Sequence, residues 1–149
     1  MSDPVVVGGI AAAVVVLVGL VVVIRIWRRN RSSIRDAIAA VAVEHMKDVL
    51  VPDGMGGEIH CEHLLLTRRG SLVINVKQYD GIIFASERMD QWTAIGSDGR
   101  STFRNPLPNL YDRVAAVRQL VRDVDVRGYA LFPGTAVFRK RRPEAVIPP

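Results

Sequence analysis

The sequence predicts one membrane helix followed by a small α/β (α+β) domain built on one mixed sheet. Two observations lead to this prediction. Apolar residues fill the stretch from Val5 to Ile24, and no charge lies between Asp3 and Arg25. After this stretch, segments with helical spacing of apolar residues alternate with short strand-like segments, a pattern typical of helices packed on a sheet. The 149-residue chain leaves room for one such domain.

The apolar run is long enough to cross a bilayer, because a spanning helix needs about 20 apolar residues. Its start is acidic and its end is basic, unlike a cleaved signal peptide. Four arginines fall within residues 25–31. By the positive-inside rule, the N-terminus lies outside and the following domain lies in the cytoplasm. We therefore expect residues 1–31 to form a single-pass anchor in the lipid bilayer. The abundance of Arg, Ala and Val indicates a bacterium, so that membrane would be its inner membrane.

Basic charge is concentrated at the two ends of the following domain. The chain has a net charge of +5, yet residues 32–138 hold 12 Lys and Arg against 13 Asp and Glu. Residues 139–142 are all basic. Net charge therefore gives no argument for a nucleic-acid-binding domain, and the two basic clusters suit anionic lipid or phosphate. A single cysteine, Cys61, rules out an intrachain disulfide and agrees with a reducing compartment.

The elements of the domain, expected over 32–138, follow from local patterns. A cap at Ser33 and apolar residues at helical spacing predict a helix that stops at Pro52. Asn105-Pro106 opens a second helix, because Asn is a good cap and Pro is tolerated at the first helical position. Residues 139–149 form a basic, proline-containing tail. Strands are predicted over 58–67, 71–77, 81–85, 92–95, 101–103, 128–132 and 135–138.

Five features follow one another in a fixed order along this domain. They are Glu58–Thr67, Gly70–Lys77, Gly81, Trp92 and Asn105–Leu107. The ordered set resembles the NERD (nuclease-related domain) family, which is assigned to the PD-(D/E)XK nuclease-like superfamily. The resemblance implies a restriction-endonuclease-like helix-strand-strand-strand-helix-strand core. It also implies a nuclease acting on DNA or RNA that depends on Mg²⁺, with Mn²⁺ as a substitute.

The resemblance implies a catalytic site on two neighbouring strands. Glu62 matches the first acid of the family, Lys77 matches its lysine, and Asn75 stands where the second acid is expected. Residues i and i+2 of a strand share a face, so residues 75 and 77 point the same way. Oxygen donors hold Mg²⁺, which makes Glu62 and Asn75 candidate metal ligands. Glu44, on the predicted first helix, and Glu58 are accessory candidates.

Asn75 leaves the function open among three classes. An amide oxygen can ligate Mg²⁺ but brings no negative charge. The first class is a membrane-anchored, metal-dependent nuclease. The second is a catalytically degenerate module that binds nucleic acid or a protein partner at the membrane. The third is a structural membrane protein whose fold is incidental.

A zinc site is not predicted. His60, Cys61 and His63 are close in sequence, but the two histidines point to opposite faces of a strand and no second Cys/His pair is present. Cys61 is expected to be a buried small hydrophobic residue. His45 is expected near the core face of the first helix.

Overall fold

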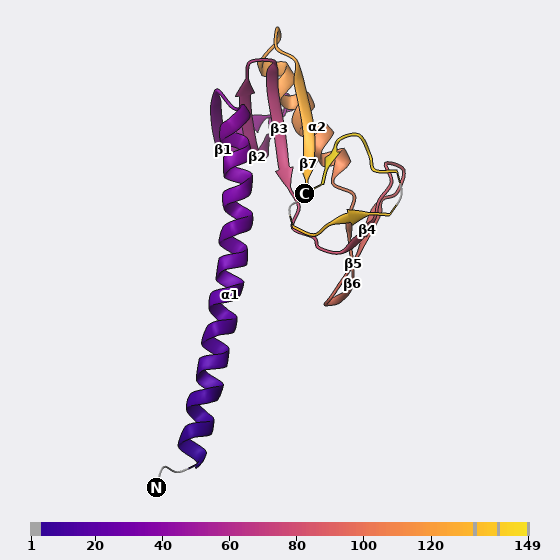
Figure 1. Cartoon of the computed structure of the whole chain (residues 1–149). Helices are drawn as coiled ribbons and strands as arrows, with labels where there is room; N and C mark the ends of the chain where they lie inside the picture. The colour runs from indigo at the N-terminus through magenta and orange to yellow at the C-terminus, as the bar shows by residue number, and fades with distance from the viewer. Residues whose placement is uncertain (1–3, 133, 140, 149) are drawn as a thin grey trace. The chain divides into compact units, whose positions relative to one another are not determined.

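The computed structural model describes residues 4–132, 134–139 and 141–148, with side chains given for 15–25 and from 34 onward within these ranges. The chain divides into two compact units, Met1–Ala37 and Ile38–Pro149. Helix α1 (Pro4–Val41) makes up most of the first unit and is drawn in indigo and purple in Figure 1.

The predicted membrane anchor at 1–31 lies partly outside the residues with described side chains. Within it, the large apolar side chains between Val15 and Ile24 are 44–72% exposed. Over the part of the chain that was described, no helix combines the length and mean hydropathy needed to span a membrane.

The helix predicted from Ser33 to Pro52 is wrong in its second half. Helix α1 ends at Val41, and residues Glu44–Pro52 form strand β1. This strand pairs in antiparallel fashion with β2 (Glu58–Thr67) at every position except Asp48 opposite Glu62. The apolar spacing that suggested a helix is overridden by this pairing, because strand preference depends on cross-strand neighbours. Glu44 and His45 are therefore strand residues.

The first sheet has five strands in the order β1-β2-β3-β7-β9. Its first three strands are antiparallel, and β3, β7 and β9 run parallel, so the sheet is mixed. Helix α2 (Leu107–Leu120) precedes β7 and packs against this sheet through a buried stripe that includes Leu110, Val114 and Val117. The remaining strands are β3 (Gly70–Val76), β7 (Val126–Leu131) and β9 (Val146–Ile147).

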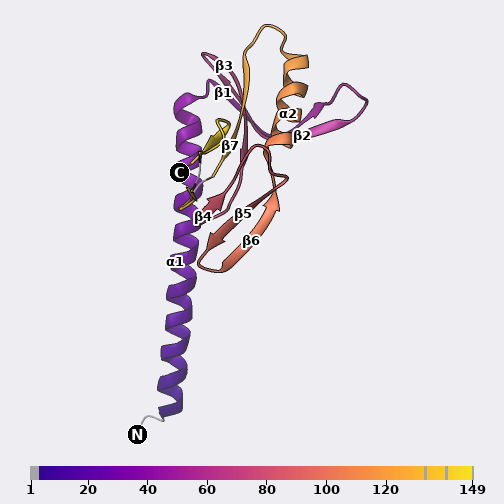
Figure 2. The same cartoon turned by 90° about the vertical axis from the view of Figure 1, so that its right-hand side faces the viewer.

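The second sheet has four strands in the order β6-β5-β4-β8 and lies beside the lower end of β3 and β7 (Figures 1 and 2). Its strands are β4 (Ile82–Phe84), β5 (Gln91–Gly96), β6 (Gly99–Arg104) and β8 (Val137–Phe138).

The α+β class and the mixed sheet are confirmed, whereas the single sheet is wrong. Gly81 lies where the chain passes from β3 to β4, with a φ of +83°. A side chain there would meet the carbonyl oxygen of Ile95. A glycine at this position therefore permits the tight turn that leads the chain from β3 into the second sheet.

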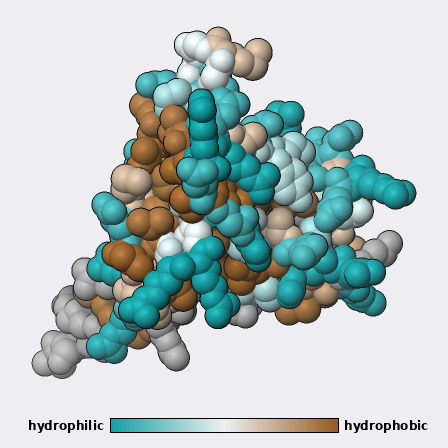
Figure 3. Space-filling view, turned by 90° about the horizontal axis from the view of Figure 1, so that it is seen from above, coloured by the Kyte–Doolittle hydropathy of each residue, from teal (hydrophilic) through white to brown (hydrophobic). Residues whose placement is uncertain are grey.

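One hydrophobic core joins the two sheets. Trp92 and Phe132 are both fully buried, with ring centroids 6.2 Å apart. Phe138 meets Phe132 edge to face at 5.3 Å, and Tyr79 stacks on Phe103 at 3.7 Å. Hydrophilic side chains cover much of the face seen from above, with apolar patches between them (Figure 3).

Candidate functional site

Strand β2 loses its regular pairing at Glu62. In the pairing with β1, Asp48 and Glu62 are the one opposite position that is not paired. Pairing resumes at Val49 opposite Cys61. The register with β3 ends one residue away, at His63 opposite Ile74. Asp48 has a φ of 53°, in the left-handed region that Asp tolerates better than most residues.

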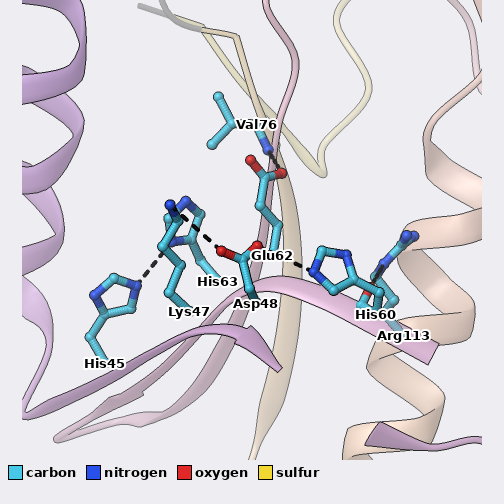
Figure 4. Close-up of polar contacts among 8 residues, drawn as sticks. All are labelled: His45, Lys47, Asp48, His60, Glu62, His63, Val76 and Arg113. Atoms are coloured by element: carbon cyan, nitrogen blue, oxygen red, sulfur yellow. Dashed lines mark hydrogen bonds and ion pairs between the residues drawn. The ribbon is translucent and has the colours of Figure 1, made fainter. Parts of the chain in front are cut away.

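The Glu62 side chain fills part of the gap. Its Oε2 accepts a hydrogen bond from the backbone N–H of Val76 at 2.8 Å (Figure 4). Val76 lies between Asn75 and Lys77, so the carboxylate is held beside the backbone of both predicted site residues. Glu62 is only half-buried. A carboxylate can accept about four hydrogen bonds or metal contacts, so this one bond leaves it able to bind a ligand.

Asn75 and Lys77 are held by the neighbouring strand. Asn75 is 7% exposed and lies opposite Ala130 of β7. Lys77 follows the last residue of β3, and its backbone N–H donates to the carbonyl of Leu131 at 2.8 Å. Among the described residues, no hydrogen bond or ion pair joins the side chains of Glu62, Asn75 and Lys77.

The two accessory acids lie apart from Glu62. Glu44 is exposed at the start of β1, opposite Leu66, and Glu58 is exposed at the start of β2. Leu66 and Glu58 are each four residues from Glu62, or about 13 Å along an extended strand. Over the described ranges, no group of three or more His, Cys, Asp or Glu side chains is arranged to hold a metal ion.

The donor set for Mg²⁺ therefore reduces to the Glu62 carboxylate and the Asn75 amide. Mg²⁺ is usually bound through one or two carboxylates, while water and substrate phosphates complete its shell. Glu62 supplies one carboxylate, the smaller of the two usual numbers, and Asn75 adds one neutral oxygen. By donor chemistry alone, this pair would suit a metal ion that is held jointly with a phosphate.

Arg113 on α2 hydrogen-bonds to a backbone carbonyl of β2, in the part of β2 that is not paired with β3. Its Nε donates to the carbonyl oxygen of His60 at 2.6 Å, and its Nη1 donates to the carbonyl oxygen of Asn109 at 2.8 Å. The guanidinium thus secures the part of β2 that has separated from β3. The sequence pattern did not single out Arg113, because only the observed strand opening gives it this partner.

Two of the three histidines contact each other, and the third contacts an acid. Nε2 of His45 lies 2.9 Å from Nδ1 of His63, and Nε2 of His60 lies 3.2 Å from a carboxylate oxygen of Asp48 (Figure 4). Burial lowers the pKa of His63, an effect that the nearby Glu62 charge opposes. The placement of His45 on a helix was wrong and concealed its pairing with His63. The alternation of Val49 and Val51 was the available signal for a strand there.

Cys61 is fully buried in the hydrophobic core, as predicted. Burial raises the pKa of its thiol. Its thiol packs in the core, whereas His60 contacts Asp48 and His63 contacts His45.

Comparison with known proteins agrees with the resemblance drawn from the sequence. The model of the nuclease-related domain family, NERD, matches residues 38–133, nearly two thirds of the chain. The chain belongs to the NERD family. An uncharacterized protein of Bacillus anthracis is 28% identical over 76 residues, which is 51% of this chain. The match covers 36% of that relative's length. No solved structure matches the chain.

Proposed function

We propose that this NERD-domain protein hydrolyses phosphodiester bonds of DNA or RNA with Mg²⁺ at a site formed by Glu62, Asn75 and Lys77. The main support is that the β2–β3 ladder ends next to Glu62, at His63, and that the β1–β2 ladder skips one position there. The carboxylate at this opening is fixed to the N–H of Val76, between the two other site residues.

The three residues have distinct roles in this proposal. Glu62 and Asn75 supply oxygen ligands, and the Val76 N–H keeps the carboxylate of Glu62 in place. When bound, Mg²⁺ or Mn²⁺ would polarise the phosphate and lower the pKa of a bound water. The ammonium of Lys77 stabilises negative charge that develops on the phosphate oxygens.

A second candidate function is binding without hydrolysis. The observation in its favour is the amide at Asn75, which leaves a single carboxylate in the donor set. Such a domain would hold nucleic acid or a protein partner at the membrane. The two candidates differ in whether the bound phosphodiester is cleaved.

Cleavage assays on the full chain in detergent micelles separate the two candidates. Single- and double-stranded DNA and RNA are incubated with Mg²⁺, with Mn²⁺ or with a chelator. Hydrolysis is expected to need metal and to be lost in Lys77→Ala and Glu62→Gln. Lys47→Ala, which removes an exposed lysine of β1, is the matched control and should retain activity. Cleavage that survives Lys77→Ala would refute the proposed site. Binding without cleavage would favour the second candidate.

The proposed location is the cytoplasmic side of a membrane, in a bacterium the inner membrane. Support comes from the uncharged apolar run from Val5 to Ile24, the exposure of its side chains from Val15 onward, and the arginines that follow. Reporter fusions to the C-terminus test this orientation. A reporter that works only in the cytoplasm should be active, and one that works only outside it should be silent. The reverse result would overturn the topology.

A further inference from the structure

The second sheet directs alternate residues into the core and out to solvent. Trp92 and Ala94 of β5 are core residues, and Phe103 of β6 packs against them. The residues between these positions point the other way and are partly or fully exposed. Because β4, β5 and β6 lie side by side (Figure 2), their outward side chains form one surface. This outer face consists of Ile82 and Phe84 of β4, Thr93 and Ile95 of β5, and Arg100 and Arg104 of β6.

Cross-strand pairing aligns these side chains in rows. Arg100 lies opposite Ile95, and Ile95 lies opposite Ile82. In the next row, Phe84 lies opposite Thr93. Side chains that are directly opposite one another start about 4.5–5.5 Å apart, so neighbours within a row can contact one ligand. The outer face therefore places arginines beside hydroxyl, aliphatic and aromatic groups.

The arginines make one edge of the outer face positive. Arg100 and Arg104 are exposed on β6, the edge strand, and lie about 14 Å apart along it. The four strands of this sheet contain no acidic residue. Asp90 and Asp98 flank β5 in the sequence, yet among the described residues neither forms an ion pair with these arginines. Both guanidinium groups are thus available to an anionic ligand.

The width and chemistry of the outer face suit a single nucleic-acid strand better than a duplex. Four strands spaced about 4.8 Å apart span about 14 Å. The major groove of a duplex is about 12 Å wide and admits a two-stranded ribbon. In a single strand, the phosphates can contact arginines while a base stacks on an aromatic ring. Phe84 is a partly exposed ring on this face.

The outer face begins close to the proposed nuclease site. Ile82 follows Lys77 by five residues, which corresponds to at most about 18 Å of extended chain. Nucleotides in a stacked strand are about 3.4 Å apart, so about six of them cover this distance. A short strand is therefore long enough to contact the outer face and the site together.

We propose that the outer face binds single-stranded DNA or RNA, with phosphates on Arg100 and Arg104 and a base stacked on Phe84. The inference rests on the proposed function and deepens it, because it names single strands as the substrate class. Arg100 and Arg104 are positioning residues in this scheme, since they hold the strand and not the reacting phosphate.

Fluorescence anisotropy tests the proposal with the full chain in detergent micelles and labelled DNA or RNA strands of about 12 nucleotides. EDTA is present, so binding is measured without metal-dependent cleavage. The double variant Arg100→Ala/Arg104→Ala should weaken binding at least tenfold. Each phosphate contact to a single strand contributes about 0.7 to the slope of log affinity against log salt, so this slope should fall by about 1.4.

The matched control is Arg68→Ala/Arg69→Ala, which removes two exposed arginines from the turn between β2 and β3. It should change affinity less than twofold and leave the salt slope unchanged. Equal losses in the two double variants would overturn the proposal, as would tighter binding of a duplex of the same length. Phe84→Leu keeps an apolar side chain but removes the ring, and it should weaken binding about fivefold. Unchanged affinity in Phe84→Leu would refute the stacking contact.

The nuclease proposal and this inference can fail separately. Glu62→Gln should lose cleavage and still bind single strands in EDTA as the wild-type chain does. Binding as predicted without any cleavage in Mg²⁺ would contradict the nuclease proposal alone. Cleavage with an unchanged KM in Arg100→Ala/Arg104→Ala would overturn this inference alone. Circular dichroism of each variant separates a lost contact from a lost fold.

Discussion

Asn105 and Glu62 are polar residues in two regions of the domain, and they differ in how completely the protein satisfies them. Asn105 is 4% exposed. Its Nδ2 donates to the carbonyl oxygens of Glu87 at 3.3 Å and Met89 at 2.9 Å, and its Oδ1 accepts the N–H of Leu107 at 2.9 Å. Glu62 is half-buried and is held by one hydrogen bond, from Val76.

The difference separates residues that build the fold from residues that can bind a ligand. The bonds of Asn105 fasten the loop before β5 to the start of α2, and little bonding capacity remains. The carboxylate of Glu62 keeps most of its capacity and lies where the β2–β3 ladder ends. The features that carry the NERD resemblance therefore include at least one residue whose task is structural.

Asn105→Ala should have the largest effect on stability. It leaves two carbonyl oxygens and one N–H without their partner in a buried place, at a cost of about 3 kcal/mol. Urea unfolding followed by circular dichroism measures this loss. Asn109→Ala, at an exposed asparagine of α2, is the control and should stay within about 0.5 kcal/mol of wild type. Similar values for the two variants would refute the structural role of Asn105.

Glu62→Ala should lower stability by less, about 1–2 kcal/mol, because one N–H loses a charged acceptor at a half-buried position. Glu62→Gln keeps an acceptor oxygen and should recover most of that loss. Both variants should abolish metal-dependent cleavage. Retained cleavage in Glu62→Gln would show that the carboxylate serves only the fold.

Asn75→Asp should tighten Mg²⁺ binding about tenfold, or about 1.4 kcal/mol, because a second carboxylate joins the donor set. Calorimetric titration of the full chain with MgCl₂ measures the change. The same variant of a Glu62→Gln chain should gain less. An unchanged affinity in Asn75→Asp would place residue 75 outside the metal site.

The smallest effect concerns pH. The pKa of His63 is lowered on folding from 6.5 by burial, so the unfolded chain binds a proton that the folded chain excludes. Stability should therefore fall as pH drops below about 6.5. Urea midpoints between pH 5 and 8 measure this slope, and His63→Gln should flatten it. A slope that is the same in the variant would contradict the assignment.

The sequence predicted most elements from β2 to β8, because alternation, turn residues and the Asn105-Pro106 helix start are local signals. The prediction was wrong at β1, because the apolar spacing there fits a helix. The segment is a strand because it pairs with β2. The sequence also gave no sign of the strand opening at Glu62. That opening depends on the left-handed backbone of Asp48 and on the divergence of β2 from β3, which are properties of the assembled sheet.

Strand β9 has a practical consequence for truncated versions of the protein. Ala130 and Phe132 donate their backbone N–H groups to the carbonyl oxygens of Ala145 and Ile147, although the family match ends at residue 133. A fragment cut at that limit would expose the outer edge of β7 as an unpaired strand, which invites aggregation. A fragment designed to be stable should therefore include the residues up to Pro148.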